Sequence, residues 1–470
     1  MKHTFIWLAS TFCLGIWSAG AQPAHASVDL SKDPTLYVVG YAHLDTEWRW
    51  EYPQVIQEYL AKTLLNNFAL IEKYPHYIFN FSGAYRYKLF KEYYPANYEK
   101  LKQYVVAGRW FPCGSSVDEC DVNSPSAESI FRQVLYGNEY FRHDFGKASE
   151  EFMLPDCFGF PASLPTILAH SGVKGFSTQK LSASWQPAPL AGGPDSPEKT
   201  PEGIPFNVGI WVGTDGSSVI AALNPDGYGG SVTGDLSKSL TGTAPTGRRG
   251  GGGQDWPKRI QINGEASGIY ADYHYYGTGD TGGSPTPNSV KMVEAIVTRS
   301  KIVPPTGGGR GQPQQEPPAD QSPVQMGDGP VHVISSKADQ MFLDILAAKP
   351  DFSKFPHYQG DLELINHSAG SLTSQAYRKR WNRKKELLAD AAEKASLAAS
   401  WLGARPYPQE RLNNAWMLTL EGQMHDILPG TATPKAYEFS WNDDVIAMNQ
   451  FSDVLTSAAE GVASGLDTQV

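Results

Sequence analysis

Four short motifs, far apart in the chain, contain histidine and aspartate residues of the types that bind divalent metals. They are His43-Leu44-Asp45, Asp156 in LPDCFGFP, Asp280 in YGTGDTGG, and His425-Asp426 in GQMHDILPG. A set of imidazole nitrogens and carboxylate oxygens suits zinc best, although manganese, cobalt and calcium also accept such ligands. Further carboxylates beside such an ion would supply acid and base groups. The motifs therefore indicate metal-assisted hydrolysis.

The elements before these motifs must bring them together. Residues 36–39 are apolar and β-branched and precede Gly40, which predicts a buried strand of a parallel sheet. Residues two apart in an extended chain point to the same side, so His43 and Asp45 can bind one ion just past the strand end. Residues 150–154 predict a second strand that leads into Asp156. Ligands bind at the carboxyl ends of strands in α/β sheets and barrels, so both motifs lie where an active site is expected.

Each motif alone has a structural alternative. A His-x-Asp run after a strand is more often a hydrogen-bonded pair than a pair of metal ligands. An aspartate before a Phe-Gly turn usually caps a loop, and the glycines around Asp280 could form only a flexible turn. Trp48 and Trp50 could be core aromatic residues. The presence of all four motifs in one chain favours the functional interpretation.

Six segments, in the same order along the chain, resemble glycoside hydrolase family 38, the α-mannosidases. They are YVVGYAHLDTEWRWEYPQ from Tyr37, PDCFGFPASLP, GFSTQKLS from Gly175, GTGDTGGSPT, TSQAYRKRWNRKKE from Thr373, and QMHDILPGT. The resemblance covers the chain from about Leu36 to Thr431. It implies a zinc-dependent retaining glycoside hydrolase that cleaves α-linked mannose from glycans or mannans through a covalent glycosyl-aspartate.

The resemblance also implies roles for individual residues. One zinc ion per chain would be bound by His43, Asp45, Asp156 and His425. Asp156 would also be the catalytic nucleophile, and Asp280 the general acid and base. The residues expected to bind the sugar are Trp48, Phe158, Tyr228 and Asp426. Retaining glycosidases place their two carboxyl groups roughly 5 to 5.5 Å apart. The acid must keep its proton near neutrality, which burial or a neighbouring carboxylate such as Asp272 would favour.

The predicted fold class is α/β, with a (β/α) barrel-like catalytic domain of mostly parallel strands followed by a three-helix bundle. The catalytic domain is predicted over 27–362 and the bundle over 363–470. Within the catalytic domain, residues 186–257 and 304–330 are rich in Gly and Pro and are predicted to be low-complexity insertions. The bundle helices are predicted at 381–402, 411–424 and 436–462, which places His425 at the end of the second.

Residues 1–26 are predicted to be a signal peptide, because a basic start precedes an apolar stretch and small residues. The apolar stretch is too short to favour a membrane span. We therefore expect export to the periplasm or the extracellular space, with no membrane span after cleavage. Three cysteines would remain, so at most one bridge can form, with Cys113 and Cys120 as the only near pair, and we expect no disulfide framework to hold the fold.

Composition limits the classes of partner. The chain has 470 residues, of which 41% are hydrophobic, so it can bury a large core and should contain more than one domain. Its net charge of −10 provides no electrostatic footprint for nucleic acid. Members of the family usually continue into β-sandwich domains, so we expect a C-terminal β-sandwich or a separate polypeptide as a partner. The sequence is also compatible with a homo-oligomer. Two alternatives also stay open: an inactive or truncated mannose-binding remnant, and another metal-dependent carbohydrate hydrolase such as a deacetylase or a phosphoesterase.

Overall fold

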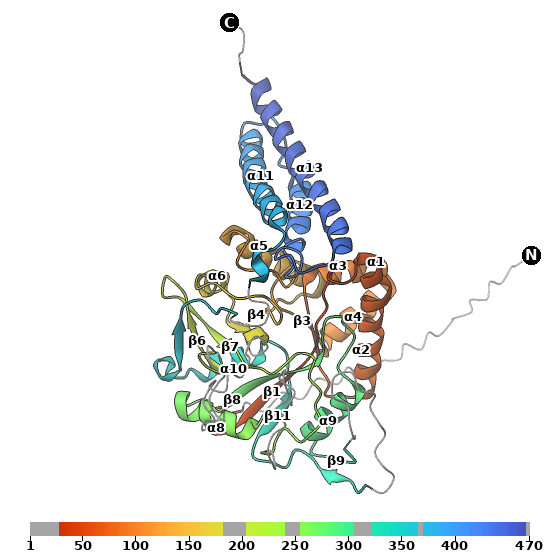
Figure 1. The fold of residues 1–470 in the computed structure, drawn as a ribbon, viewed down its shortest axis with the longest axis vertical. Helices are drawn as coiled ribbons and strands as arrows, with labels where there is room; N and C mark the ends of the chain where they lie inside the picture. The colour runs from red at the N-terminus through yellow and green to blue at the C-terminus, as the bar shows by residue number, and fades with distance from the viewer. Residues whose placement is uncertain (1–27, 182–203, 240–253, 305–320, 365–369, 467–470) are drawn as a thin grey trace, which may run out of the picture.

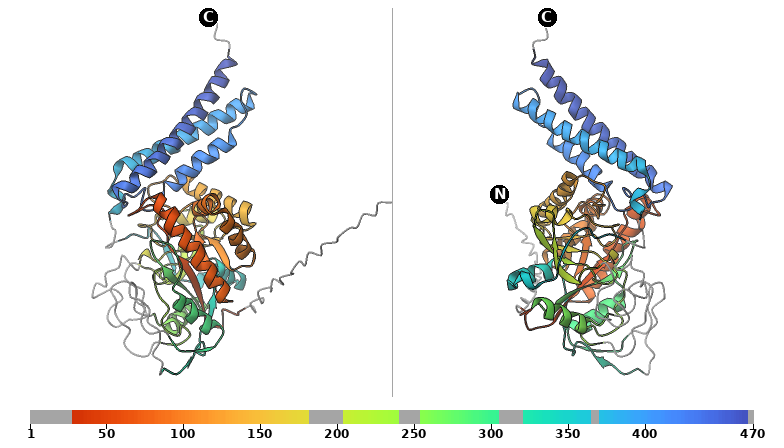
Figure 2. Two further views of the ribbon diagram at one scale, coloured as in Figure 1. Left: turned by 90° about the vertical axis from the view of Figure 1, so that its right-hand side faces the viewer. Right: turned by 60° about the vertical axis from the view of Figure 1, so that its left-hand side comes forward.

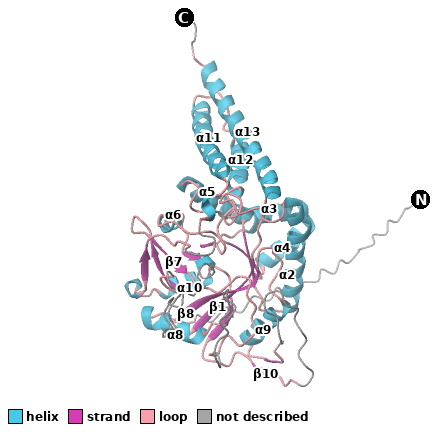
Figure 3. Ribbon diagram, in the orientation of Figure 1, coloured by secondary structure: helices cyan, strands magenta, loops and turns pink. Residues whose placement is uncertain are grey.

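The computed structural model describes residues 28–181, 204–239, 254–304, 321–364 and 370–466. An α/β body occupies the first four ranges, and three long helices project from one end of it (Figure 1). The predicted signal peptide lies outside the described residues. Strands run through the middle of the body and helices surround them (Figure 3).

The first sheet contains five strands, and all its pairings are parallel. Its strands are β1 (Thr35–Ala42), β2 (Phe79–Ser82), β3 (Trp110–Cys113), β8 (Ala271–Thr278) and β11 (His332–Ser335). Strand β1 pairs with β8 along its whole length, and on its other side with β11 near its start and β2 near its end. Every residue of β1 is buried, as expected for a parallel strand covered on both faces.

The second sheet has the order β12-β6-β7-β5-β4. Its strands are β4 (Glu151–Met153), β5 (Gly175–Ser177), β6 (Val208–Val212), β7 (Ser218–Ala222) and β12 (His357–Gln359). Of its pairings only β6 with β7 is antiparallel. A small antiparallel pair joins β9 (Lys301–Ile302) to β10 (Val324–Gln325). The α/β fold with mostly parallel strands followed by a helical bundle is confirmed, with the hydrogen bonds dividing the strands into two main sheets.

One sequence-based expectation needs correction. The prediction of a low-complexity insertion over 186–257 was wrong for 208–222, because β6 and β7 lie there, while 186–203 and 240–253 lie outside the described residues. The short apolar runs of these two strands are buried in the second sheet, but the Gly/Pro/Ser/Thr-rich stretches on either side hide them in the average composition. The sequence allowed at most one bridge, between Cys113 and Cys120, and in the structure these two residues and Cys157 are free and buried.

The helices of the body cover the sheets. They are α1 (Tyr52–Gln54), a π-helical segment (Val55–Leu60) that continues into α2 (Ala61–Lys73), α3 (Ala84–Tyr93), α4 (Pro95–Val106), α5 (Ala127–Phe145), α6 (Leu164–His170), α8 (Trp256–Ser267), α9 (Pro287–Val297) and α10 (Gln340–Ala348). Short 3-10 turns occur at Phe352–Lys354 and Ser371–Thr373. Helix α5 begins where the Ser126 side chain accepts a hydrogen bond from the Ser129 N–H, and ends at Gly146, whose φ is 67°.

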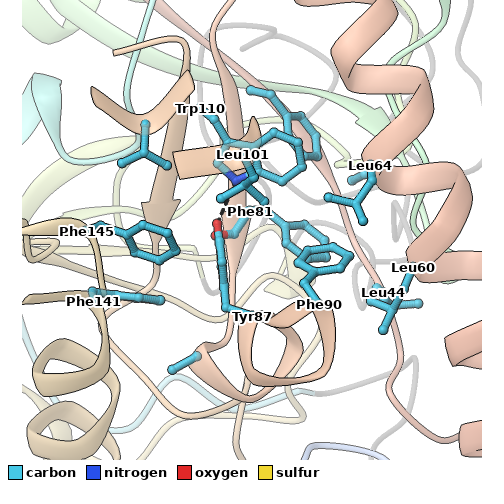
Figure 4. Close-up of a cluster of buried hydrophobic side chains, with 14 of the residues drawn as sticks. Leu44, Leu60, Leu64, Phe81, Tyr87, Phe90, Leu101, Trp110, Phe141 and Phe145 are labelled. Atoms are coloured by element: carbon cyan, nitrogen blue, oxygen red, sulfur yellow. Dashed lines mark hydrogen bonds between the residues drawn. The ribbon is translucent and has the colours of Figure 1, made fainter. Parts of the chain in front are cut away.

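An aromatic core lies between α2, α3 and the first sheet (Figure 4). Phe81 and Trp110 contribute to it from β2 and β3, and the Trp110 indole donates a hydrogen bond of 2.8 Å to the Tyr87 hydroxyl. Leu44 belongs to the same core and is fully buried. Because neighbouring side chains of an extended segment alternate in direction, the burial of Leu44 turns the side chains of His43 and Asp45 together to the opposite side.

The three projecting helices are α11 (Ala376–Trp401), α12 (Gln409–Glu421) and α13 (Pro434–Ser464). They form a bundle that leans away from the body near α3 and α5 (Figure 2). A short antiparallel backbone ladder joins the bundle to the body. The Asp121 N–H donates to the Gln423 carbonyl at 2.9 Å, and the His425 N–H donates to the Glu119 carbonyl at 3.1 Å. The ladder therefore fixes the segment after α12 against the loop that follows β3.

Candidate metal centre

The structure brings the four expected ligands together. His43 and Asp45 follow β1, Asp156 follows β4, and His425 follows α12. One ligand atom from each lies within 4.8 Å of the others. The Nε2 atom of His43 is 2.9 Å from Asp45 Oδ1 and 3.8 Å from Asp156 Oδ2. The Nε2 atom of His425 is 3.1 Å from the same Asp45 oxygen.

These residues fit a divalent metal ion. Nitrogen and oxygen ligands bound to zinc at roughly 2.0 to 2.2 Å lie at most about 4.4 Å from one another, so the observed separations need only small adjustments. Within the described part of the chain, neither ring nitrogen of the fully buried His43 forms a hydrogen bond of normal geometry. Since Nε2 is directed at two carboxylates, a cation between them would satisfy all three groups.

The electrostatics of the cluster favour positive charge. Burial alone would lower the pKa of His425, but its hydrogen bond to Asp45 and the charge of Asp426 raise it to about 9. Burial and the charge of Asp45 raise the pKa of Asp426 to about 7. The carboxylates thus produce a negative potential that a metal ion would neutralise.

Asp280 lies beside this cluster. Strands β1 and β8 stay paired beyond their ends, so the Asp45 N–H donates to the Asp280 carbonyl at 2.9 Å. The Tyr228 hydroxyl donates to Asp280 Oδ1 at 3.0 Å, and the Tyr228 ring centroid is 4.6 Å from that of His43. Asp280 has a φ of 66°, a left-handed conformation that aspartate adopts more readily than most residues. The glycine-rich motif thus presents a carboxyl group to the centre.

Asp272 does not assist Asp280, contrary to the expectation from the sequence. It lies near the start of β8, whereas Asp280 follows the end of this eight-residue strand. The Asp272 carboxylate forms an ion pair with Arg259, with a separation of 3.0 Å between Oδ2 and Nε. Sequence spacing could not reveal this separation, because it depends on the direction in which the strand runs.

Lys180 contacts the expected nucleophile. Its ammonium group donates a hydrogen bond to Asp156 Oδ1, and its Nζ lies 4.8 Å from the ring centroid of Phe158. The side chain of Lys180 is only 5% exposed and that of Asp156 is 17% exposed, so this ion pair is partly buried. The Phe158 ring in turn lies 6.3 Å from that of His425. Lys180 follows β5 in the GFSTQKLS segment, but the sequence alone provided no reason to assign it a role.

The remaining two expected sugar-binding residues lie on loops that contact each other. The Asp426 carboxylate accepts a hydrogen bond from Thr431, and Asp426 Oδ2 is 3.8 Å from His425 Nε2. The Trp48 carbonyl accepts a hydrogen bond of 2.8 Å from the Thr433 N–H. The Trp48 ring packs against Arg49, whose guanidinium carbon is 4.1 Å from the ring centroid. Asp426 therefore lies next to the expected ligand His425. Trp48 lies on a loop that is hydrogen-bonded to the segment after Asp426.

Glu119 is a further buried residue that the sequence analysis missed. Its Oε2 lies 2.9 Å from His43 Nδ1, and its main-chain carbonyl is 2.9 Å from His425 Nδ1. Burial would raise the pKa of Glu119, but the charges of His43 and Arg86 lower it to about 2. Its position in a loop after β3 was the one available signal, and many acidic loop residues share that position.

Comparison with known proteins now identifies the family. The model for the N-terminal domain of glycosyl hydrolases family 38 matches residues 33–306, which is more than half of the chain. The chain belongs to glycosyl hydrolase family 38. The alpha mannosidase middle domain matches residues 367–461, a range that contains most of the bundle. Three of the expected metal ligands belong to the first matched region and the fourth, His425, belongs to the second.

Relatives with curated names are longer than this family 38 chain. Alpha-mannosidase G of Dictyostelium discoideum is 30% identical over 416 residues, covering 88% of this chain and 32% of that protein. Human alpha-mannosidase 2C1 is 28% identical over 433 residues, covering 92% of this chain and 35% of that protein. The chain thus spans about a third of the length of these relatives. A solved alpha-mannosidase from Enterococcus faecalis V583 shares the fold, with a TM-score of 0.67 and 17% identity, covering 93% of this chain and 43% of that one.

Proposed function

We propose that this protein is a zinc-dependent retaining α-mannosidase that releases α-linked mannose from glycans or mannans. The observation that carries the proposal is the convergence of two imidazole nitrogens and two carboxylate oxygens within 4.8 Å, with Asp280 beside them. The curated relatives named above are alpha-mannosidases, which supports the choice of substrate. One zinc ion per chain would be held by His43, Asp45, Asp156 and His425.

The proposed reaction uses two carboxyl groups in two steps. In the first step Asp156 attacks the anomeric carbon, and the glycosidic bond breaks as Asp280 gives its proton to the leaving oxygen. In the second step Asp280 takes a proton from water, whose oxygen attacks the same carbon and releases mannose and the Asp156 carboxylate. Bound zinc would supply a Lewis acid that holds sugar hydroxyls.

Neighbouring side chains orient the two carboxyl groups. Lys180 contacts Asp156 Oδ1, while Oδ2 is directed towards His43, so the two oxygens of the nucleophile have different partners. Tyr228 holds the Asp280 carboxyl through Oδ1. Lys180 and Tyr228 both lie on loops that follow strands of the second sheet, and these two contacts support the proposed orientation of the two carboxyl groups. Trp48, Phe158 and Asp426 are proposed to bind the sugar.

The proposed location of this chemistry is outside the cytoplasm. The support is the sequence of residues 1–26, which has the pattern of a signal peptide. Among the described residues, no helix combines the length and the hydropathy needed to cross a membrane. A C-terminal β-sandwich or a separate polypeptide is proposed to complete the sugar site.

The first experiment measures metal and turnover on one purified sample. Metal content is determined by mass spectrometry, and release from an activated aryl α-mannoside is assayed before and after chelation. One zinc per chain with chelator-sensitive release of mannose is the expected result. Zinc without turnover would favour the mannose-binding alternative, whereas release of acetate or phosphate from suitable esters would favour another hydrolase. A fluorinated mannosyl fluoride should leave a sugar attached to the peptide that contains Asp156.

A further inference from the structure

A single residue, Glu119, contacts both histidines of the metal centre on the side away from the cluster. Its carboxylate is 2.9 Å from His43 Nδ1. Both side chains are fully buried, so water does not compete for this contact. This contact is close but lacks the geometry of a normal hydrogen bond; since a carboxylate has no proton to offer the ring, it nevertheless stabilises the neutral imidazole that carries its proton on Nδ1. The lone pair is therefore on Nε2, the atom that faces Asp45 and Asp156.

The main chain of Glu119 has the same effect on His425. Its carbonyl oxygen is 2.9 Å from His425 Nδ1 and also accepts from the His425 main-chain N–H at 3.1 Å. A carbonyl can only accept, so the proton of this neutral imidazole is also on Nδ1 and its Nε2 faces Asp45. The two histidines, from different parts of the chain, thus present the same ring nitrogen to one point.

The Glu119 carboxylate is itself held firmly. Its Oε1 accepts hydrogen bonds from Tyr41 at the end of β1 and Ser82 at the end of β2. Arg86 on α3 lies 3.4 Å from the same oxygen and is fixed by a 2.7 Å contact with Asp118. All these donors approach Oε1, which leaves Oε2 to His43. Strands β1 and β2 and helix α3 therefore determine where Oε2 lies.

We propose that Glu119 is the positioning residue of the metal centre, which fixes the tautomer and orientation of both histidine ligands so that each offers Nε2. This inference rests on the proposed zinc site. Glu119 does not touch the metal or the sugar, and acts through the imidazoles. Partners of this kind typically contribute about 10- to 100-fold to metal affinity.

The test compares Glu119→Gln with Ser267→Ala in the full chain. Zinc affinity is measured by competition with a chromophoric chelator. Glu119→Gln removes the anionic acceptor of His43 and should weaken zinc binding by about 10- to 100-fold. Ser267→Ala is the control, because it also removes a buried polar group, but one whose 2.6 Å hydrogen bond is to the Asn263 carbonyl within α8 and which is no partner of Glu119. Its zinc affinity should stay close to that of the unaltered chain.

Nitrogen NMR of the zinc-loaded histidines separates positioning from a general loss of packing. Glu119→Gln should shift the Nδ1 resonance of His43 and leave that of His425, whose partner is a main-chain carbonyl. If Glu119→Gln binds zinc as tightly as the unaltered chain, with both resonances unchanged, the inference is overturned while the proposed function stands. If the unaltered chain binds no zinc, the metal centre itself is refuted. Should Glu119→Gln not fold, Glu119→Asp keeps the charge but retracts the carboxylate, and wild-type zinc affinity in that variant would likewise overturn the inference.

Discussion

Replacing Gly277 by alanine should damage the centre without touching any reacting group. Gly277 of β8 pairs with Tyr41 of β1; Tyr41 is two residues before His43, and Gly277 is three residues before Asp280. A Cβ on Gly277 would lie 1.7 Å from the Tyr41 carbonyl oxygen. Carbon and oxygen normally stay at least about 3.3 Å apart, so the strands must separate by roughly 1.6 Å. A displacement of about 1 Å in a site can cost 100-fold in rate, so we expect kcat/KM to fall at least about 100-fold.

The assay combines hydrolysis of an aryl α-mannoside, zinc content and the melting temperature. Overpacking of this kind also typically costs about 1 to 3 kcal/mol of stability, so the melting temperature should fall. Gly234→Ala is the matched control, because a Cβ there would meet nothing within 4 Å, and it should leave all three measurements unchanged. The reasoning is refuted if Gly277→Ala keeps the zinc content, the melting temperature and the kcat/KM of the unaltered chain.

Four further predictions follow from the same geometry. Asp280→Ala should keep zinc and slow mannosides with poor leaving groups far more than activated ones, because only the former need a proton; equal losses would argue against its acid role. Lys180→Met should lower kcat with activated mannosides, while Lys180→Arg, which keeps the charge beside Asp156, should lower it less; a melting curve controls for folding, and equal rates for the two would contradict the role of the charge. Burial and the charge of Asp339 raise the pKa of Glu151 from 4.5 to about 8, so the folded state keeps a proton that the unfolded chain loses. Stability from this group is present below pH 4.5 and is lost as the pH rises to about 8, and Glu151→Gln should flatten the dependence of the urea midpoint on pH in that window; an unchanged slope would be the contrary result. Finally, zinc present at 1,000 times its Kd should stabilise the fold by about 4 kcal/mol, so chelation should lower the melting temperature, and an unaltered melting curve would exclude zinc as a link between body and bundle.

The sequence predicts the parts of the site whose geometry is local. His43 and Asp45 are two residues apart after a buried strand, and that spacing alone places them on one side. The convergence of His425 with them was expected only from a family resemblance, since no local rule joins residues 380 positions apart. The short apolar runs of β6 and β7 could not be recognised because Gly-, Pro-, Ser- and Thr-rich sequence lies on both sides of them.

The contacts of Glu119 and Lys180 were beyond prediction for a different reason. Each residue follows a strand, but whether a side chain reaches the centre depends on the register of neighbouring strands and on the bundle. Asp272 shows the converse error, because it is close to Asp280 in sequence but is paired with Arg259 near the other end of β8. Within one strand, the number of residues between two positions determines how far apart they lie in space. Between two strands it does not, because the fold decides which strands are neighbours.

The backbone ladder between 119–121 and 423–425 has a consequence for the order of events during synthesis. Asp45 and His425 are separated by 380 residues, so at about 5 to 20 residues per second His425 is synthesised roughly 20 to 75 seconds after Asp45. Until the bundle docks, the body would offer a metal ion only three of the four proposed ligands and would leave one coordination position open. Docking of the bundle would fill that position, so the selectivity of the proposed centre for its metal would be set only once the later part of the chain is in place.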